Sequence, residues 1–145
     1  MVVKIQNEFG RLQEVELSDF EKENSIELPK DYRDFLLEVN GGKPTPNENR
    51  NPPTVVTYIL GMHNGEYYAS LYKHIDMFKN RLPVSTFPIA TDAFGNLFIM
   101  SVHSESYGHV YFWGHEGESE YQDGHYVDNC SFVAYSFSEF INNLT

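Results

Sequence analysis

The sequence contains little cysteine and no long hydrophobic run. Its 145 residues include one cysteine, Cys130, which excludes a disulfide within the chain. No apolar run approaches the roughly 20 residues that a membrane-spanning helix needs. The residues after Met1 show no signal-peptide pattern, so we expect a cytoplasmic protein without membrane association.

Positive charge is also scarce. Only 10 Lys and Arg residues stand against 21 Asp and Glu residues, which gives a formal net charge of −11. Such a chain repels phosphate backbones and anionic lipids, so we expect no direct binding of nucleic acid or of a membrane surface. The charge suits rapid association with a basic protein. Many soluble proteins are acidic without having a basic partner, so charge alone leaves both interpretations open.

The motifs of several common enzyme classes are absent. The chain has no glycine-rich phosphate-binding motif, no G-x-S-x-G and no H-E-x-x-H. Cys130 has no identifiable base that would activate it as a nucleophile. His103, His109 and His115 are six residues apart, which matches no common metal-ligand spacing. Residues 92–96 are better explained by a turn than by a calcium loop, because an apolar strand follows them. We therefore expect no enzymatic activity, no cofactor and no metal.

Helices are predicted where capping residues precede an apolar stripe. A capping box that starts at Ser18 predicts the beginning of the first helix. A second helix follows Pro29 and ends at residues 40–42, Asn-Gly-Gly, because these residues readily adopt the left-handed conformation that closes a helix. Helical spacing recurs over residues 68–78, and a second capping box predicts the last helix after Ser136.

Strands are predicted where β-branched and aromatic residues cluster, and three of them are joined by short polar turns into an antiparallel meander. The proline-framed stretch 43–53 and the polar stretch 114–129 are predicted to be loops. This order of elements predicts an α+β fold: one domain over residues 1–145, with helices on one face of a mainly antiparallel sheet. The strands are expected at residues 54–60, 87–91, 97–102, 109–113 and 131–135.

The predicted loop 114–129 is strongly acidic and has three interpretations. Its carboxylates are a solvated charge run, a recognition surface for a basic protein, or paired catalytic acids. Catalysis is the least favoured, because it requires carboxylates held in a cleft. Tyrosines in and near the loop would supply the buried anchors of a recognition surface. The candidate partner-binding residues are Glu105, Tyr107, Glu116, Glu118, Glu120, Tyr121, Asp123, Tyr126 and Asp128.

Four segments, in order along the chain, resemble the SUKH superfamily, and most closely its branch named for the yeast cell-wall assembly regulator. The resemblance covers residues 16–144. The segments are Phe20-Glu21 and Ile26-Glu27-Leu28-Pro29-Lys30-Asp31-Tyr32-Arg33-Asp34-Phe35-Leu36-Leu37 with Asn40-Gly41-Gly42, Phe87-Pro88-Ile89-Ala90-Thr91-Asp92-Ala93-Phe94-Gly95-Asn96, Gly108-His109-Val110-Tyr111-Phe112-Trp113-Gly114-His115, and Ser136-Phe137-Ser138-Glu139-Phe140.

The resemblance implies an α+β fold whose central, twisted, mainly antiparallel sheet is flanked by helices. It also implies a non-enzymatic role, because bacterial members are typically immunity proteins that bind and neutralise secreted toxins, many of them nucleases. The expected partner is therefore a cognate, basic toxin of the nuclease type, and the loops 43–53 and 114–129 are expected to determine partner choice. An intracellular scaffold or adaptor for another protein is the alternative, and a metal-dependent hydrolase is the least favoured. The sequence defines no oligomeric state.

Overall fold

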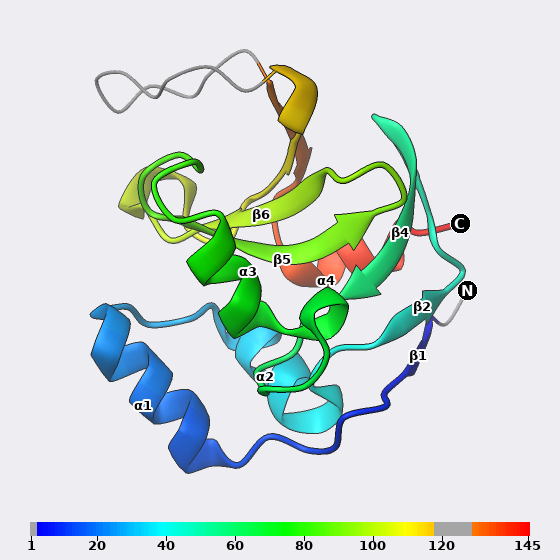
Figure 1. Ribbon diagram of the computed structural model, residues 1–145. Helices are drawn as coiled ribbons and strands as arrows, with labels where there is room; N and C mark the ends of the chain where they lie inside the picture. Colours follow the sequence, from blue (N-terminus) through cyan, green and yellow to red (C-terminus); the bar gives the residue numbers. More distant parts are fainter. Residues whose placement is uncertain (1–2, 118–128) are drawn as a thin grey trace.

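The computed structural model describes residues 3–117 and 129–145, and these form four α-helices, eight strands and three short 3-10 turns (Figure 1). The helices are α1 (Glu14–Asn24), α2 (Lys30–Val39), α3 (Leu71–Met77) and α4 (Phe137–Asn142). The strands are β1 (Lys4–Gln6), β2 (Lys43–Thr45), β3 (Glu48–Arg50), β4 (Pro53–Ile59), β5 (Thr86–Asp92), β6 (Leu97–Ser101), β7 (Val110–Trp113) and β8 (Cys130–Ala134). The 3-10 turns are η1 (Tyr67–Ala69), η2 (Ser104–Ser106) and η3 (His115–Gly117).

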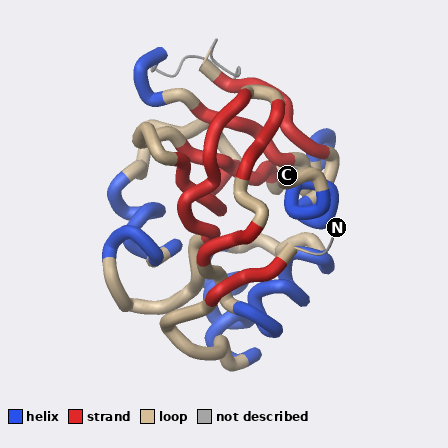
Figure 2. The backbone as a smooth tube through the Cα atoms, turned by 90° about the vertical axis from the view of Figure 1, so that its right-hand side faces the viewer, coloured by secondary structure: helices blue, strands red, loops and turns tan. Residues whose placement is uncertain are grey.

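Six strands form one antiparallel sheet in the order β3-β4-β5-β6-β7-β8, and β1 pairs with β2 in a small second sheet. Strands that follow one another in the chain are therefore neighbours in the large sheet, as short connections favour. Figure 2 shows this sheet as a curved layer with helices packed around it. The predicted α+β class with a mainly antiparallel sheet is confirmed.

The end of α2 shows how the Asn-Gly-Gly sequence joins a helix to the sheet. Asn40 has a left-handed backbone (φ 41°), and its amide nitrogen donates to the carbonyl of Leu36 at 3.0 Å. The Asn40 side chain accepts a hydrogen bond from the Met62 backbone N–H at 2.8 Å and donates to the Met62 carbonyl at 3.2 Å. Gly41 (φ 81°) lies so close to β4 that a Cβ would come within 2.5 Å of the Ile59 carbonyl oxygen. The predicted end of this helix is confirmed.

The predicted start of the first helix is wrong. Helix α1 begins at Glu14, and its capping box is formed by Gln13 and Glu16. Ser18 lies inside the helix, where its hydroxyl accepts a hydrogen bond from Arg33 at 3.3 Å. The carboxylate of Glu21, which a capping box at Ser18 would require, instead binds α2 and the segment before it. Tertiary contacts therefore use the two side chains that the local pattern assigned to a cap.

The stretch 43–53 was predicted to be a loop, but it contains β2 and β3. Strand β2 pairs with β1, which lies almost forty residues earlier in the chain, and β3 pairs with β4. Each strand has only three residues and includes polar or proline positions, so neither shows the alternation that predicts a strand. Pairing with distant backbone creates β2, whereas β3 forms a tight hairpin with the adjacent β4.

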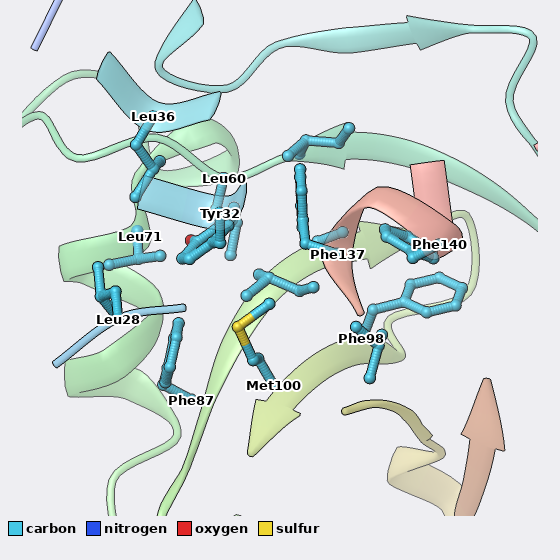
Figure 3. Packing of buried hydrophobic residues seen from close by; sticks show 14 of the residues in the cluster. Leu28, Tyr32, Leu36, Leu60, Leu71, Phe87, Phe98, Met100, Phe137 and Phe140 are labelled. Atoms are coloured by element: carbon cyan, nitrogen blue, oxygen red, sulfur yellow. The ribbon is translucent and has the colours of Figure 1, made fainter. Parts of the chain in front are cut away.

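Two groups of buried side chains lie on opposite faces of the large sheet. The larger cluster lies between the sheet and the helices α2 and α4, and Figure 3 shows its aromatic and aliphatic side chains in contact. The smaller cluster lies on the other face, where Phe78 meets Trp113 edge to face at 5.6 Å. Strand β6 contributes side chains to both clusters, because its successive residues point to opposite faces of the sheet.

Candidate partner-binding surface

The structure describes three of the nine residues predicted to bind a partner: Glu105, Tyr107 and Glu116. The other six, Glu118, Glu120, Tyr121, Asp123, Tyr126 and Asp128, lie outside the described residues. Glu105 and Tyr107 belong to the turn that precedes β7, whereas Glu116 follows that strand. A strand of four residues spans about 13 Å. The three described residues therefore lie at opposite ends of β7 and form no single cluster.

Tyr107 has a structural contact as well as an exposed ring. Its hydroxyl donates a hydrogen bond to the backbone carbonyl of Glu27, in the connection between α1 and α2. The pKa of this hydroxyl is raised, first by burial and then by the carboxylates of Glu27, Glu21 and Asp31. A Cβ added at the next residue, Gly108, would lie 3.5 Å from the Pro29 ring. Tyr107 thus holds the β6–β7 turn against the helices, while 44% of the residue stays exposed.

Glu116 is exposed and follows His115, which connects the turn after β7 to the turn between β5 and β6. The backbone N–H of His115 donates to the Asn96 side chain at 3.0 Å, and its ring Nε2 lies 2.9 Å from the Phe94 carbonyl oxygen. In the same turn the Asp92 carboxylate accepts hydrogen bonds from the backbone N–H groups of Phe94 and Asn96, at 2.9 and 2.8 Å. Asp92 and Asn96 therefore stabilise the turn, as the sequence predicts.

An exposed aromatic cluster lies on β7, β8 and the residues next to them. We define it as His109, Tyr111, Phe132 and Tyr135. Phe132 lies opposite Tyr111 in the strand register, with ring centroids 5.9 Å apart. Phe132 is 4.8 Å from Tyr135, and His109 is 5.3 Å from Tyr135. Phe132 is 44% exposed and Tyr135 is 65% exposed. The rings therefore form one continuous patch that water reaches.

The position of the cluster follows from the strand geometry. Val110 and Phe112 point to the helix-covered face of β7, so His109, Tyr111 and Trp113 point to the other face. The smaller buried cluster covers Trp113 completely and packs against part of Tyr111, which leaves Tyr111 half-buried and Phe132 and Tyr135 exposed. Alternation along residues 109–113 places His109 and Tyr111 on one face. Phe132 of β8 and the following Tyr135 lie beside them because β8 pairs with β7.

Comparison with known proteins identifies the family. A model of the SMI1/KNR4 family (SUKH-1) matches residues 11–143. The chain belongs to this family. It is also 28% identical over 150 aligned positions to the SPbeta prophage-derived uncharacterized protein YokK of Bacillus subtilis (strain 168), and the match covers 89% of this chain and 72% of that protein. The match to the SMI1/KNR4 family includes every residue of the aromatic cluster.

Burial shifts the pKa values of two side chains in this SUKH-1 chain that can carry chemistry in proteins, Cys130 and His74. Cys130 begins β8, and burial raises the pKa of its thiol to about 11. His74 is buried, its Nδ1 lies 2.9 Å from the Ser70 carbonyl oxygen, and burial lowers its pKa. Residues 3–117 and 129–145 contain no group of three side chains that would hold a metal ion. No helix in these ranges is long and apolar enough to cross a membrane.

Proposed function

We propose that this SUKH-1 protein is an immunity protein, which binds a protein toxin in the cytoplasm and neutralises it without catalysing a reaction. The observation that carries the proposal is the exposed aromatic cluster in a chain of this family. Tyr and Phe rings bury large apolar areas at interfaces, and tyrosines are enriched among the residues that dominate the binding free energy. The matched prophage protein supports a bacterial setting for the fold.

The charge of the chain supports a basic partner, such as a nuclease. A nuclease binds a polyanion and therefore presents positive charge at its active site. A protein with a net charge of −11 attracts such a surface over a distance of several ångströms and repels the nucleic acid that would compete for it. The long-range charge would speed association, and the aromatic cluster would provide the short-range contacts that slow dissociation.

The direct test is co-expression with the product of each neighbouring gene that proves toxic when expressed alone. Relief of toxicity, together with co-purification as a complex, is expected for the cognate toxin. Association should slow as salt rises from 50 to 500 mM, because screening weakens charge attraction. Unrelieved toxicity without a complex would contradict the proposal. Specific co-purification of a non-toxic assembly or signalling protein would instead favour the scaffold role.

A further inference from the structure

A groove of about 380 Å³ lies between α1 and α3, outside the surface described above. Its apolar floor is formed by Phe20 of α1 and by Tyr72 and Ile75 of α3. The Phe20 and Tyr72 rings are in contact, with centroids 6.1 Å apart. Figure 1 shows α1 at the opposite end of the molecule from β8, the last strand of the chain. The groove is therefore separate from the aromatic cluster.

Carboxylates line both sides of this groove. Glu16, Asp19 and Glu23 project from one face of α1, because their spacing of three and four residues matches the helical repeat. Asp76 lies on the α3 side. All four residues are exposed. Lys and Arg are absent from the residues that line the groove.

The ion pairs of the described chain leave these four carboxylates without a cation. The ion pairs found in residues 3–117 and 129–145 join Arg33 to Glu14 and Glu21, and Lys30 to Asp34. Lys73, on α3, donates to the backbone carbonyl of Gly65 at 2.7 Å. The carboxylates also act on Tyr72, because burial first, and then Glu16 and Glu23, raise the pKa of its hydroxyl.

We propose that this groove binds an amphipathic segment of the protein partner that carries several Lys or Arg residues. The charged ends of such side chains would pair with the carboxylates on both sides, while their aliphatic stems cover Ile75 and the two rings. A guanidinium over Phe20 or Tyr72 would add a cation–π contact. Nucleic acid, anionic lipid and a second copy of this acidic chain would all be repelled. The inference rests on the proposed function for the presence of a protein partner, but it does not require that partner to be a toxin.

A synthetic peptide tests the groove directly on the full chain. The probe is a helical peptide with Arg and Leu at alternate turns, and the comparison peptide has Glu in place of Arg. In a nuclear magnetic resonance titration at 100 mM salt, the Arg peptide should shift the backbone amides of residues 16–24 and 72–76, and the Glu peptide should not. Shifts spread evenly over the acidic surface would overturn the proposal.

Matched variants separate the effect of position from the effect of charge. The combination Glu16→Gln, Asp19→Asn and Glu23→Gln should weaken binding of the Arg peptide at least tenfold. The control combination Glu38→Gln, Glu48→Gln and Glu66→Gln changes the net charge equally at exposed sites on other elements, and it should weaken binding less than twofold. Equal weakening in both variants would overturn the proposal. Asp76→Asn provides an independent change on the α3 side.

The same samples also test whether the variant stays folded, and whether the groove instead binds a metal cation or a second copy of this chain. The triple groove variant should stay folded and melt within a few degrees of the wild type, because relief of repulsion between like charges along α1 offsets the loss of the Glu16 charge near the start of that helix. Titration with CaCl₂ or MgCl₂ alone should leave the groove resonances unchanged, and saturable shifts there would identify a cation site instead. Light scattering should show no self-association that depends on the groove carboxylates; such association would identify a second copy as the occupant.

The two proposals fail in different ways. If no neighbouring gene product is neutralised but the Arg peptide binds the groove, the immunity function is wrong and the groove assignment stands. If a toxin is neutralised equally well by the triple groove variant and the Arg peptide does not bind, the groove assignment is wrong and the immunity function stands.

Discussion

Phe132 and Tyr111 face each other across β7 and β8, with ring planes inclined at 80° and centroids 5.9 Å apart. The pair forms the centre of the aromatic cluster, and Phe132 is 44% exposed. A ring of this size at a protein surface is most readily explained as a binding contact when other rings adjoin it, as His109 and Tyr135 do here.

Replacement of Phe132 by Ala should weaken binding of the partner by about 10- to 100-fold, which corresponds to roughly 1.4–2.8 kcal/mol. Stability should change by less than about 1 kcal/mol, because the ring is only partly buried. Binding is measured by calorimetry and stability by urea unfolding. Phe94→Ala is the matched control, since Phe94 is 70% exposed on the β5–β6 turn. Equal losses of affinity in the two variants would show that the cluster has no special role.

Two substitutions of Tyr107 separate its structural contact from its exposed ring. Tyr107→Phe removes the hydrogen bond to the Glu27 carbonyl and should lower the free energy of unfolding by about 0.5–1.5 kcal/mol. Partner affinity should stay within twofold of the wild type if only the ring contacts the partner. Tyr107→Ala should lower affinity as well as stability. An affinity loss already present in Tyr107→Phe would show that the hydroxyl, or the turn position that it maintains, contributes to binding.

The hydroxyl of Tyr32 is fully buried, and within residues 3–117 and 129–145 it has no hydrogen-bond partner. Figure 3 shows Tyr32 among apolar side chains of the core. Burial raises the pKa of this hydroxyl, so it remains protonated. Tyr32→Phe should therefore raise the free energy of unfolding by about 1 kcal/mol, because it removes an unpaired polar group and keeps the ring. Urea unfolding at pH 7 measures the change. A loss of stability would reveal a favourable partner of the hydroxyl, such as a buried water molecule.

Stability should fall as the pH decreases from 7.5 to 5, in part because of His74. This imidazole is stacked between Tyr67 and Phe78, and burial lowers its pKa below the ordinary value of 6.5. The unfolded state then binds more protons than the folded state between the two pKa values. The stabilisation is complete above about pH 6.5 and is lost as the pH falls below it, with a slope of at most about 1.4 kcal/mol per pH unit.

The variant His74→Gln tests this pH dependence. It removes the titrating group, so its free energy of unfolding should vary less steeply with pH than that of the wild type over the same range. His63, whose pKa is also lowered by burial and by Lys73, should leave some slope in the variant. Urea unfolding at several pH values measures both slopes. Parallel curves for the two proteins would show that His74 does not contribute.

The elements that sequence patterns predicted well are those whose cause is local. Helix α2 has an apolar stripe on one face and an Asn-Gly-Gly sequence at its end, and both act through neighbouring residues. The meander of β5, β6 and β7 is predicted for the same reason, since each strand pairs with the next one along the chain. Ser136 accepts a hydrogen bond from the Glu139 N–H at 3.1 Å and begins α4 as predicted.

By itself, the sequence determined the fold class and the order of the meander, because hydrophobic periodicity, capping residues and turn residues act over a few positions. The resemblance of four ordered segments indicated the family. Only the tertiary structure decided that Ser18 and Glu21 bind Arg33 instead of capping a helix, and that residues 43–45 form a strand with β1. It also brought Phe132 onto Tyr111 and separated Glu105 from Glu116 by the length of β7. The contacts of Arg33 and the pairings of β1 with β2 and of β7 with β8 join segments that are separated in the chain, and short-range patterns do not encode which segments meet.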